Sequence, residues 1–135
     1  MIRRGERLFG VDQRLQAVVR AAAQLVLPND VQVIEGVRTL ERQKQLYAQG
    51  RTAPGAICTW TLQSKHIGGL AVDVALLQVD GSINWNDPAG FDRLAEAMFT
   101  ASRQVGVRLR WGADWDQDGN PRERGESDSP HFELA

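Results

Sequence analysis

Apolar residues recur at three- and four-residue steps over residues 12–27 and 87–105, which is the spacing of one helix face. Asp12 can cap the first helix and Pro28 ends it, while Asp87–Pro88 suits the start of the later one. A helix is also predicted over residues 39–49, with Thr39 as its cap and Gly50 at its end.

Five other segments alternate apolar and polar positions or are rich in β-branched residues, as strands are. A length of 135 residues suits a single domain, here residues 1–135. The pattern therefore predicts an α+β fold in which helices pack on a small antiparallel sheet. The predicted strands are residues 31–36, 70–77, 82–85, 107–111 and 131–134.

The composition is that of an ordinary globular protein, with 42% hydrophobic and 24% charged residues. A net charge of −1 argues against a nucleic-acid binder. We expect no membrane span, because no stretch approaches the ~20 apolar residues it requires. A single cysteine and the lack of a signal-like apolar core near the start favour synthesis in a reducing cytoplasm. We expect a monomer.

The chain has only two histidines, His66 and His131, and each lies near a carboxylate, Asp73 or Asp128. Two imidazoles and one carboxylate can hold zinc and leave a fourth position for water, as catalytic zinc sites do. The remaining carboxylate would be free to act as a base on that water. Each histidine alone also fits a hydrogen-bonded structural role.

The two carboxylates have different surroundings. Asp73 stands inside an apolar strand, where a carboxylate is costly unless a cation or several donors neutralise it. Pro130 disfavours helix at the preceding residue, so Asp128 is expected on a loop, within reach of zinc-bound water. Glu133 lies two residues after His131 on the same strand face and is the second candidate for the base.

The pattern Ser-x-His-x-x-Gly-x-Ala-x-Asp at residues 64–73, with Asp-x-x-His at 128–131, resembles a family of zinc peptidases. This is the D-Ala-D-Ala carboxypeptidase/dipeptidase and L-alanyl-D-glutamate peptidase family, and short phage endolysins are the nearest match. The resemblance extends to residues 36–50 and to the Trp-Gly-Ala-Asp-Trp segment at 111–115, where Ala113 replaces the usual second glycine.

This resemblance implies a hedgehog/D-Ala-D-Ala-peptidase-like fold and an endopeptidase that hydrolyses the L-Ala–D-Glu bond of the peptidoglycan stem peptide. It assigns zinc to His66, Asp73 and His131, and the role of catalytic base and acid to Asp128. Arg38 would bind substrate or steady the developing oxyanion, which its fixed set of donors suits. A surface ion pair is the alternative for Arg38. Lysis would require another component to release the enzyme to the cell wall.

Two further residues are candidates for substrate binding. Ser64 can hydrogen-bond substrate or simply end the loop before His66. Trp111 can line the cleft and stack on substrate, as can Trp115, although a partly buried structural tryptophan is an equal alternative.

Residues 114–120 begin like a calcium loop, with acidic residues at the first, third and fifth places and glycine at the sixth. The twelfth place is Gly125 rather than Glu, so a standard EF-hand fails. A looser calcium site and a solvated acidic loop remain alternatives. The candidate calcium ligands are Asp114, Asp116, Asp118, Asn120 and Glu123.

Two other functions stay open on the sequence. A D-Ala-D-Ala carboxypeptidase or dipeptidase would use the same chemistry, whereas a non-enzymatic zinc-binding module could dispense with Asp128.

Overall fold

The computed structural model describes residues 1–55, 65–123 and 126–135. Its centre is a five-stranded sheet in the order β1-β2-β3-β5-β4. All neighbouring pairs are antiparallel except β1 and β2, so the predicted antiparallel sheet gains one parallel edge. The strands are β1 (Ile2–Arg3), β2 (Val31–Glu35), β3 (Ala71–Leu76), β4 (Leu109–Trp111) and β5 (His131–Leu134).

The three predicted helices are confirmed as α1 (Gln13–Leu25), α2 (Leu40–Ala48) and α3 (Pro88–Val105). The side chains of Asp12, Thr39 and Asp87 each accept a backbone N–H in the first turn, as capping residues do.

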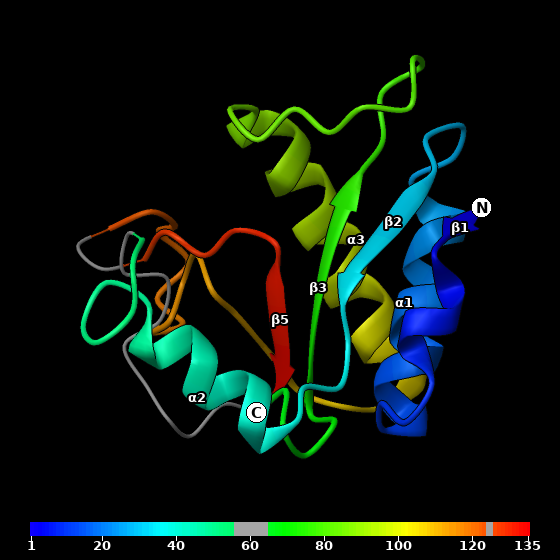
Figure 1. The fold of residues 1–135 in the computed structure, drawn as a ribbon. Helices are drawn as coiled ribbons and strands as arrows, with labels where there is room; N and C mark the ends of the chain where they lie inside the picture. The colour runs from blue at the N-terminus through cyan, green and yellow to red at the C-terminus, as the bar shows by residue number, and fades with distance from the viewer. Residues whose placement is uncertain (56–64, 124–125) are drawn as a thin grey trace.

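The hydrophobic core lies between the sheet and the paired helices α1 and α3, which cover one of its faces (Figure 1). Strand residues that point to this side, such as Val72, Val74 and Phe132, are fully buried. Because side chains alternate across a strand, the residues between them face the opposite side of the sheet. That side carries the polar site.

Three details differ from the prediction. Residues 82–85 form no strand, because this segment folds back on itself through the Gln78 N–H to Ser82 carbonyl bond. A short strand β1 and a 3₁₀ helix at Gly5–Leu8 precede α1.

Among the described residues, no helix is long and apolar enough to cross a membrane.

Candidate metal centre

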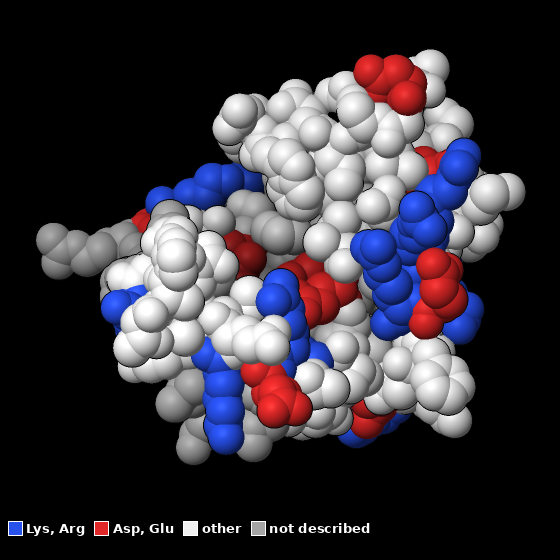
Figure 2. Space-filling model, viewed as in Figure 1, with Lys and Arg blue, Asp and Glu red and all other residues white. Residues whose placement is uncertain are grey.

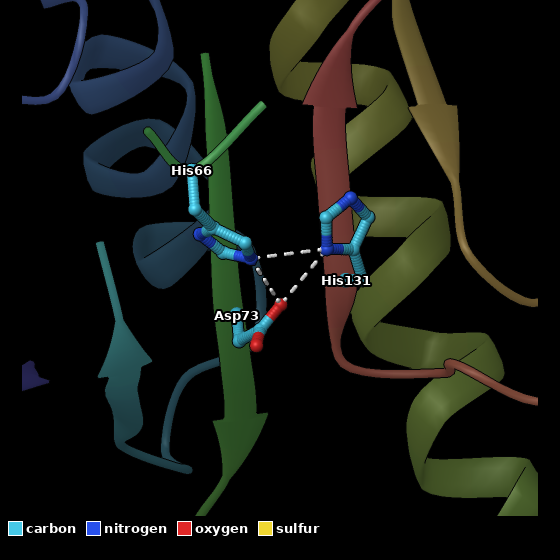
Figure 3. Close-up of side chains that lie close together, drawn as sticks. All are labelled: His66, Asp73 and His131. Carbon is cyan, nitrogen blue, oxygen red and sulfur yellow. Dashed lines mark hydrogen bonds and ion pairs between the residues drawn. The ribbon is translucent and has the colours of Figure 1, made fainter. Parts of the chain in front are cut away.

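The strand register brings the two ends of the site together. Asp73 on β3 is directly opposite His131 on β5, so both side chains project from the same face of the sheet. His66 comes from the turn before β3 and points at the same spot (Figure 3). The pairing of β3 with β5 therefore joins segments that lie 58 residues apart in the chain.

The three candidate ligand atoms form a compact triangle. His66 Nε2 lies 3.2 Å from His131 Nδ1, and Asp73 Oδ1 lies 3.3 Å and 3.1 Å from these two nitrogens. Zinc bonds of 2.0–2.1 Å at tetrahedral angles separate ligand atoms by about 3.3–3.4 Å. The spacing of these donors thus fits a zinc ion with little rearrangement.

His66 is held by backbone groups of the segment that follows β2. Its Nδ1–H donates to the Gly36 carbonyl over 2.8 Å, and its own carbonyl accepts from the Arg38 N–H over 2.8 Å. The ring is buried, at 2% exposure. Because Nδ1–H is directed at the Gly36 carbonyl, Nε2 is the nitrogen left to face the other two candidate ligands.

His131 is oriented from the opposite side, by Glu133. Its Nε2 lies 2.8 Å from Glu133 Oε1, which leaves Nδ1 toward Asp73 and His66. Burial disfavours the charged ring, but the hydrogen bonds with Asp73 and Glu133 outweigh burial and raise the pKa of His131 to about 9. This applies to the protein without metal.

Asp73 is ionised despite its position in the sheet. Burial tends to raise its pKa, yet the hydrogen bonds from His131 and His66 lower the pKa well below the usual range. The negative charge of Asp73 within an apolar strand is therefore stabilised by the two imidazoles. A bound cation would stabilise it in the same way.

Asp128 lies on the loop before β5, as predicted, and its side chain is 51% exposed. Its Oδ2 is 3.8 Å from His131 Nδ1, close to the triangle but outside it. Burial, followed by the negative charge of Asp73, raises the pKa of Asp128. A carboxylate with a raised pKa beside a metal position suits proton transfer.

Glu133, the second candidate for the base, is placed differently. Its side chain is 6% exposed and is engaged by His131, Lys65 and Arg110. Desolvation opposes ionisation, but these partners lower its pKa to about 2. Glu133 faces the ring nitrogen of His131 that points away from Asp73 and His66, which favours Asp128 over Glu133 as the candidate base.

Arg38 is mostly buried at the edge of the same site. It forms a bidentate ion pair with Glu35, and its Nη1 donates to the Gln43 side chain. Hydrogen bonding to Glu35 raises the pKa of Arg38 despite burial, with added contributions from Asp73 and Asp128. It is therefore not a simple surface ion pair, and two of its five N–H groups remain beyond the described bonds.

Trp111 belongs to the core instead of the cleft. It is 6% exposed, stacks on Phe132, and donates its indole N–H to the Ser129 carbonyl over 2.6 Å. Its structural alternative is therefore favoured over stacking on substrate. Trp115 lies nearer the site, with its ring 5.3 Å from that of His131. Ser64 lies outside the described residues.

The acidic loop is compact and gathers like charges. Ligand atoms of Asp114, Asp116 and Asp118 lie within 4.8 Å of one another, and so do those of Asp116, Glu123 and Glu126. Hydrogen bonding with Asp118, then burial and charge repulsion, raise the pKa of Glu123 to about 7. Glu126, which the sequence did not single out as a ligand, is buried and accepts the Asp116 N–H.

Space-filling shows a hollow near the middle of the face viewed in Figure 1, with acidic side chains inside it and basic ones beside it (Figure 2). The structure brings together the predicted residues His66, Asp73 and His131, while the contacts of Glu35 with Arg38 and of Lys65 with Glu133 were not predicted. The two-residue spacing of Glu133 from His131 indicates in the sequence that both side chains lie on one strand face. No sequence pattern indicates that Glu35 pairs with Asp73 across β2 and β3, because this pairing depends on the strand register.

Comparison with known proteins gives consistent matches over nearly the whole chain. A family model described as phage L-alanyl-D-glutamate peptidase matches residues 2–135. The L-alanyl-D-glutamate peptidase of Escherichia phage T5 is 35% identical over 133 residues, which cover 96% of this chain and 93% of that protein.

Two bacterial proteins are also similar. The peptidoglycan L-alanyl-D-glutamate endopeptidase CwlK of Bacillus subtilis is 34% identical over 128 residues, covering 92% of this chain and 71% of CwlK. The crystal structure of the L-Ala D-Glu endopeptidase ChiX of Serratia marcescens superposes with a TM-score of 0.78 at 30% identity, covering 100% of this chain and 90% of ChiX.

Proposed function

Because this chain belongs to the phage L-alanyl-D-glutamate peptidase family, we propose that it is a zinc-dependent endopeptidase that hydrolyses the L-Ala–D-Glu bond of peptidoglycan stem peptides. Residues 1–135 form one catalytic domain, which acts as a monomer. The observation that carries the proposal is the convergence of His66, Asp73 and His131 beside a half-exposed carboxylate.

The donor set itself favours zinc. Two imidazole nitrogens and one carboxylate oxygen are typical of catalytic zinc sites, and three protein ligands leave a position for solvent or substrate. When bound, zinc supplies a Lewis acid that polarises a carbonyl and lowers the pKa of a coordinated water.

Asp128 is the proton-transfer group at the open side of this site. As a carboxylate it accepts a proton from the attacking water, and as the acid it returns that proton to the leaving amine of D-Glu. Its raised pKa eases the first of these steps, since a more basic carboxylate accepts the proton of the attacking water more readily.

Arg38 stabilises the negative charge that develops on the carbonyl oxygen of L-Ala. Glu35 and Gln43 hold the guanidinium in one orientation, so its remaining N–H groups are preorganised for this task. A fixed donor costs little reorganisation when charge appears, which is why the buried ion pair supports a catalytic role.

The substrate places the working site at the bacterial cell wall. We propose that the protein is made in the host cytoplasm and reaches peptidoglycan after another lysis component opens the way. The peptidoglycan substrate named for CwlK and the phage source of the T5 relative support this proposal.

Digestion of purified peptidoglycan tests the activity. The protein with zinc should release new amino-terminal D-Glu, identified by mass spectrometry of the products. Asp128→Ala should retain zinc and lose cleavage, with Glu96→Ala on the exposed surface of α3 as the matched control. Release of free D-alanine instead would indicate carboxypeptidase activity, and cleavage by Asp128→Ala would refute the role of this residue.

We also propose that the acidic loop binds calcium through Asp114, Asp116, Asp118, Asn120 and Glu123. Support comes from the crowding of carboxylates and the raised pKa of Glu123, both of which a divalent cation with oxygen ligands would relieve. The loop continues into Asp128 and β5, so ordering it would also order the proton-transfer group.

A further inference from the structure

Glu133 has contacts that exceed what a structural ion pair requires. One carboxylate oxygen, Oε1, lies 2.8 Å from His131 Nε2, and the other, Oε2, lies 2.9 Å from Arg110 and 3.1 Å from Lys65. Both oxygens are therefore engaged, and the residue is 5% exposed. A buried carboxylate with two cations on one oxygen and an imidazole on the other is held in a single orientation.

The orientation of this carboxylate has a chemical consequence for His131. An ionised carboxylate only accepts hydrogen bonds, so the ring nitrogen that faces Glu133 must carry a proton. In the neutral ring the lone pair is then on Nδ1, the atom that faces Asp73 and His66. The opposite tautomer would turn an N–H toward the metal position.

His66 reaches the complementary state by a different route. The Gly36 carbonyl accepts from its Nδ1–H, which leaves Nε2 for the metal. The two histidines thus present different nitrogens, and each is set by a separate acceptor. For His131 this acceptor is a charged side chain that substitution can remove, whereas for His66 it is a backbone carbonyl.

Lys65 connects the two histidine segments. It precedes His66 in sequence, and its Nζ contacts Glu133 and donates to the Leu134 carbonyl on β5. Arg110 on the neighbouring strand β4 completes the cationic side. The Glu133 carboxylate therefore ties the turn that carries His66 to the strand that carries His131, without help from a metal.

We propose that Glu133 is a positioning residue, which selects the Nδ1-coordinating tautomer of His131 and joins both histidine segments into a preformed zinc site. The inference rests on the zinc site of the proposed function, although not on the bond that is cleaved. Carboxylates on the outer nitrogen of a metal-bound histidine contribute to affinity, and their loss typically weakens metal binding about 10- to 100-fold.

The test measures zinc itself as the ligand. Zinc dissociation constants are obtained by chelator competition for wild type, Glu133→Ala and Glu133→Gln, with Glu96→Gln on the exposed face of α3 as a matched control. We expect Glu133→Ala to bind zinc about 10- to 100-fold more weakly. Glu133→Gln keeps an acceptor oxygen and should show an intermediate loss, whereas Glu96→Gln should match wild type.

A second readout separates positioning from simple structural support. In the zinc-loaded wild type, imidazole ¹⁵N spectra should show His131 with a zinc-bound Nδ1 and a protonated Nε2 whose hydrogen exchanges slowly. Only two histidines contribute signals, which makes assignment direct. In Glu133→Gln the Nε2 hydrogen should exchange faster. A purely structural residue would lower the melting temperature and leave zinc affinity and this signal unchanged.

The inference is overturned if both Glu133 variants bind zinc as tightly as wild type, or if His131 coordinates zinc through Nε2. Should Glu133→Ala fail to fold, Glu133→Gln and the wild-type spectrum still decide. If wild type binds zinc as expected but leaves the L-Ala–D-Glu bond intact, the proposed function fails while the role of Glu133 stands.

Discussion

The metal-free protein should lose stability as pH rises through the titration of His131. Folding raises the pKa of this ring from 6.5 to about 9, through Asp73 and Glu133 and against the cost of burial. A group whose folded pKa is raised stabilises the protein fully below its unfolded pKa. That contribution disappears as pH rises through the folded pKa. The affected window therefore runs from about pH 6.5 to about pH 9.

The size of the effect follows from the same two values. At 1.36 kcal/mol for each pKa unit, the rise corresponds to about 3 kcal/mol of unfolding free energy. For a chain of this length that amounts to a decrease in Tm of roughly 10 °C. Asp73 and Glu133 have lowered pKa values and stay ionised throughout, so they add no slope in this window.

Urea unfolding of chelator-treated protein at a series of pH values measures this slope. Glu123, with a pKa raised to about 7, also titrates nearby, so the decisive range lies above pH 7.5. His131→Gln is the matched variant, because it lacks the titrating ring. Saturating zinc should abolish the slope, since the metal displaces the proton. A flat wild-type profile, or an equal slope in His131→Gln, would show that His131 is not the source of the pH dependence.

Three other predictions address the remaining parts of the site. Arg38→Lys breaks the bidentate pair with Glu35 and should lower kcat by about 10²–10³, the expected cost of losing one oxyanion donor. Zinc binding should not weaken. An unchanged kcat in a peptidoglycan turnover assay would contradict this prediction. Gly112→Ala would place a Cβ 2.2 Å from the Asp128 carbonyl and 3.0 Å from His131 Cβ, so both zinc affinity and cleavage should fall, which isothermal titration and turnover can measure together. Calcium should raise the Tm of the zinc-loaded protein and speed lysis, and activity that is unchanged after selective calcium removal would rule out regulation by the acidic loop.

Much of the local structure was predictable, because its causes lie within a few neighbouring residues. Asp12, Thr39 and Asp87 cap their helices through bonds that span two or three positions. The donor types of the metal site were equally visible, since a chain with two histidines has few ways to build it. The segment at 82–85 was mispredicted because alternation over four residues does not ensure a strand partner.

The order of the amino acids specifies which reactive groups are present and which helices and strands carry them. Which of these groups meet depends on strand register and burial, and both are properties of the folded chain. The β3–β5 register aligns Asp73 with His131, and Glu133 lies beside the outer nitrogen of His131, in contact with Lys65 and Arg110. Trp111 lies in the core because the β4–β5 register pairs it with Phe132, so that the two rings stack on the same face of the sheet. Such long-range pairings follow from the packing of the whole sheet, and no local pattern encodes them.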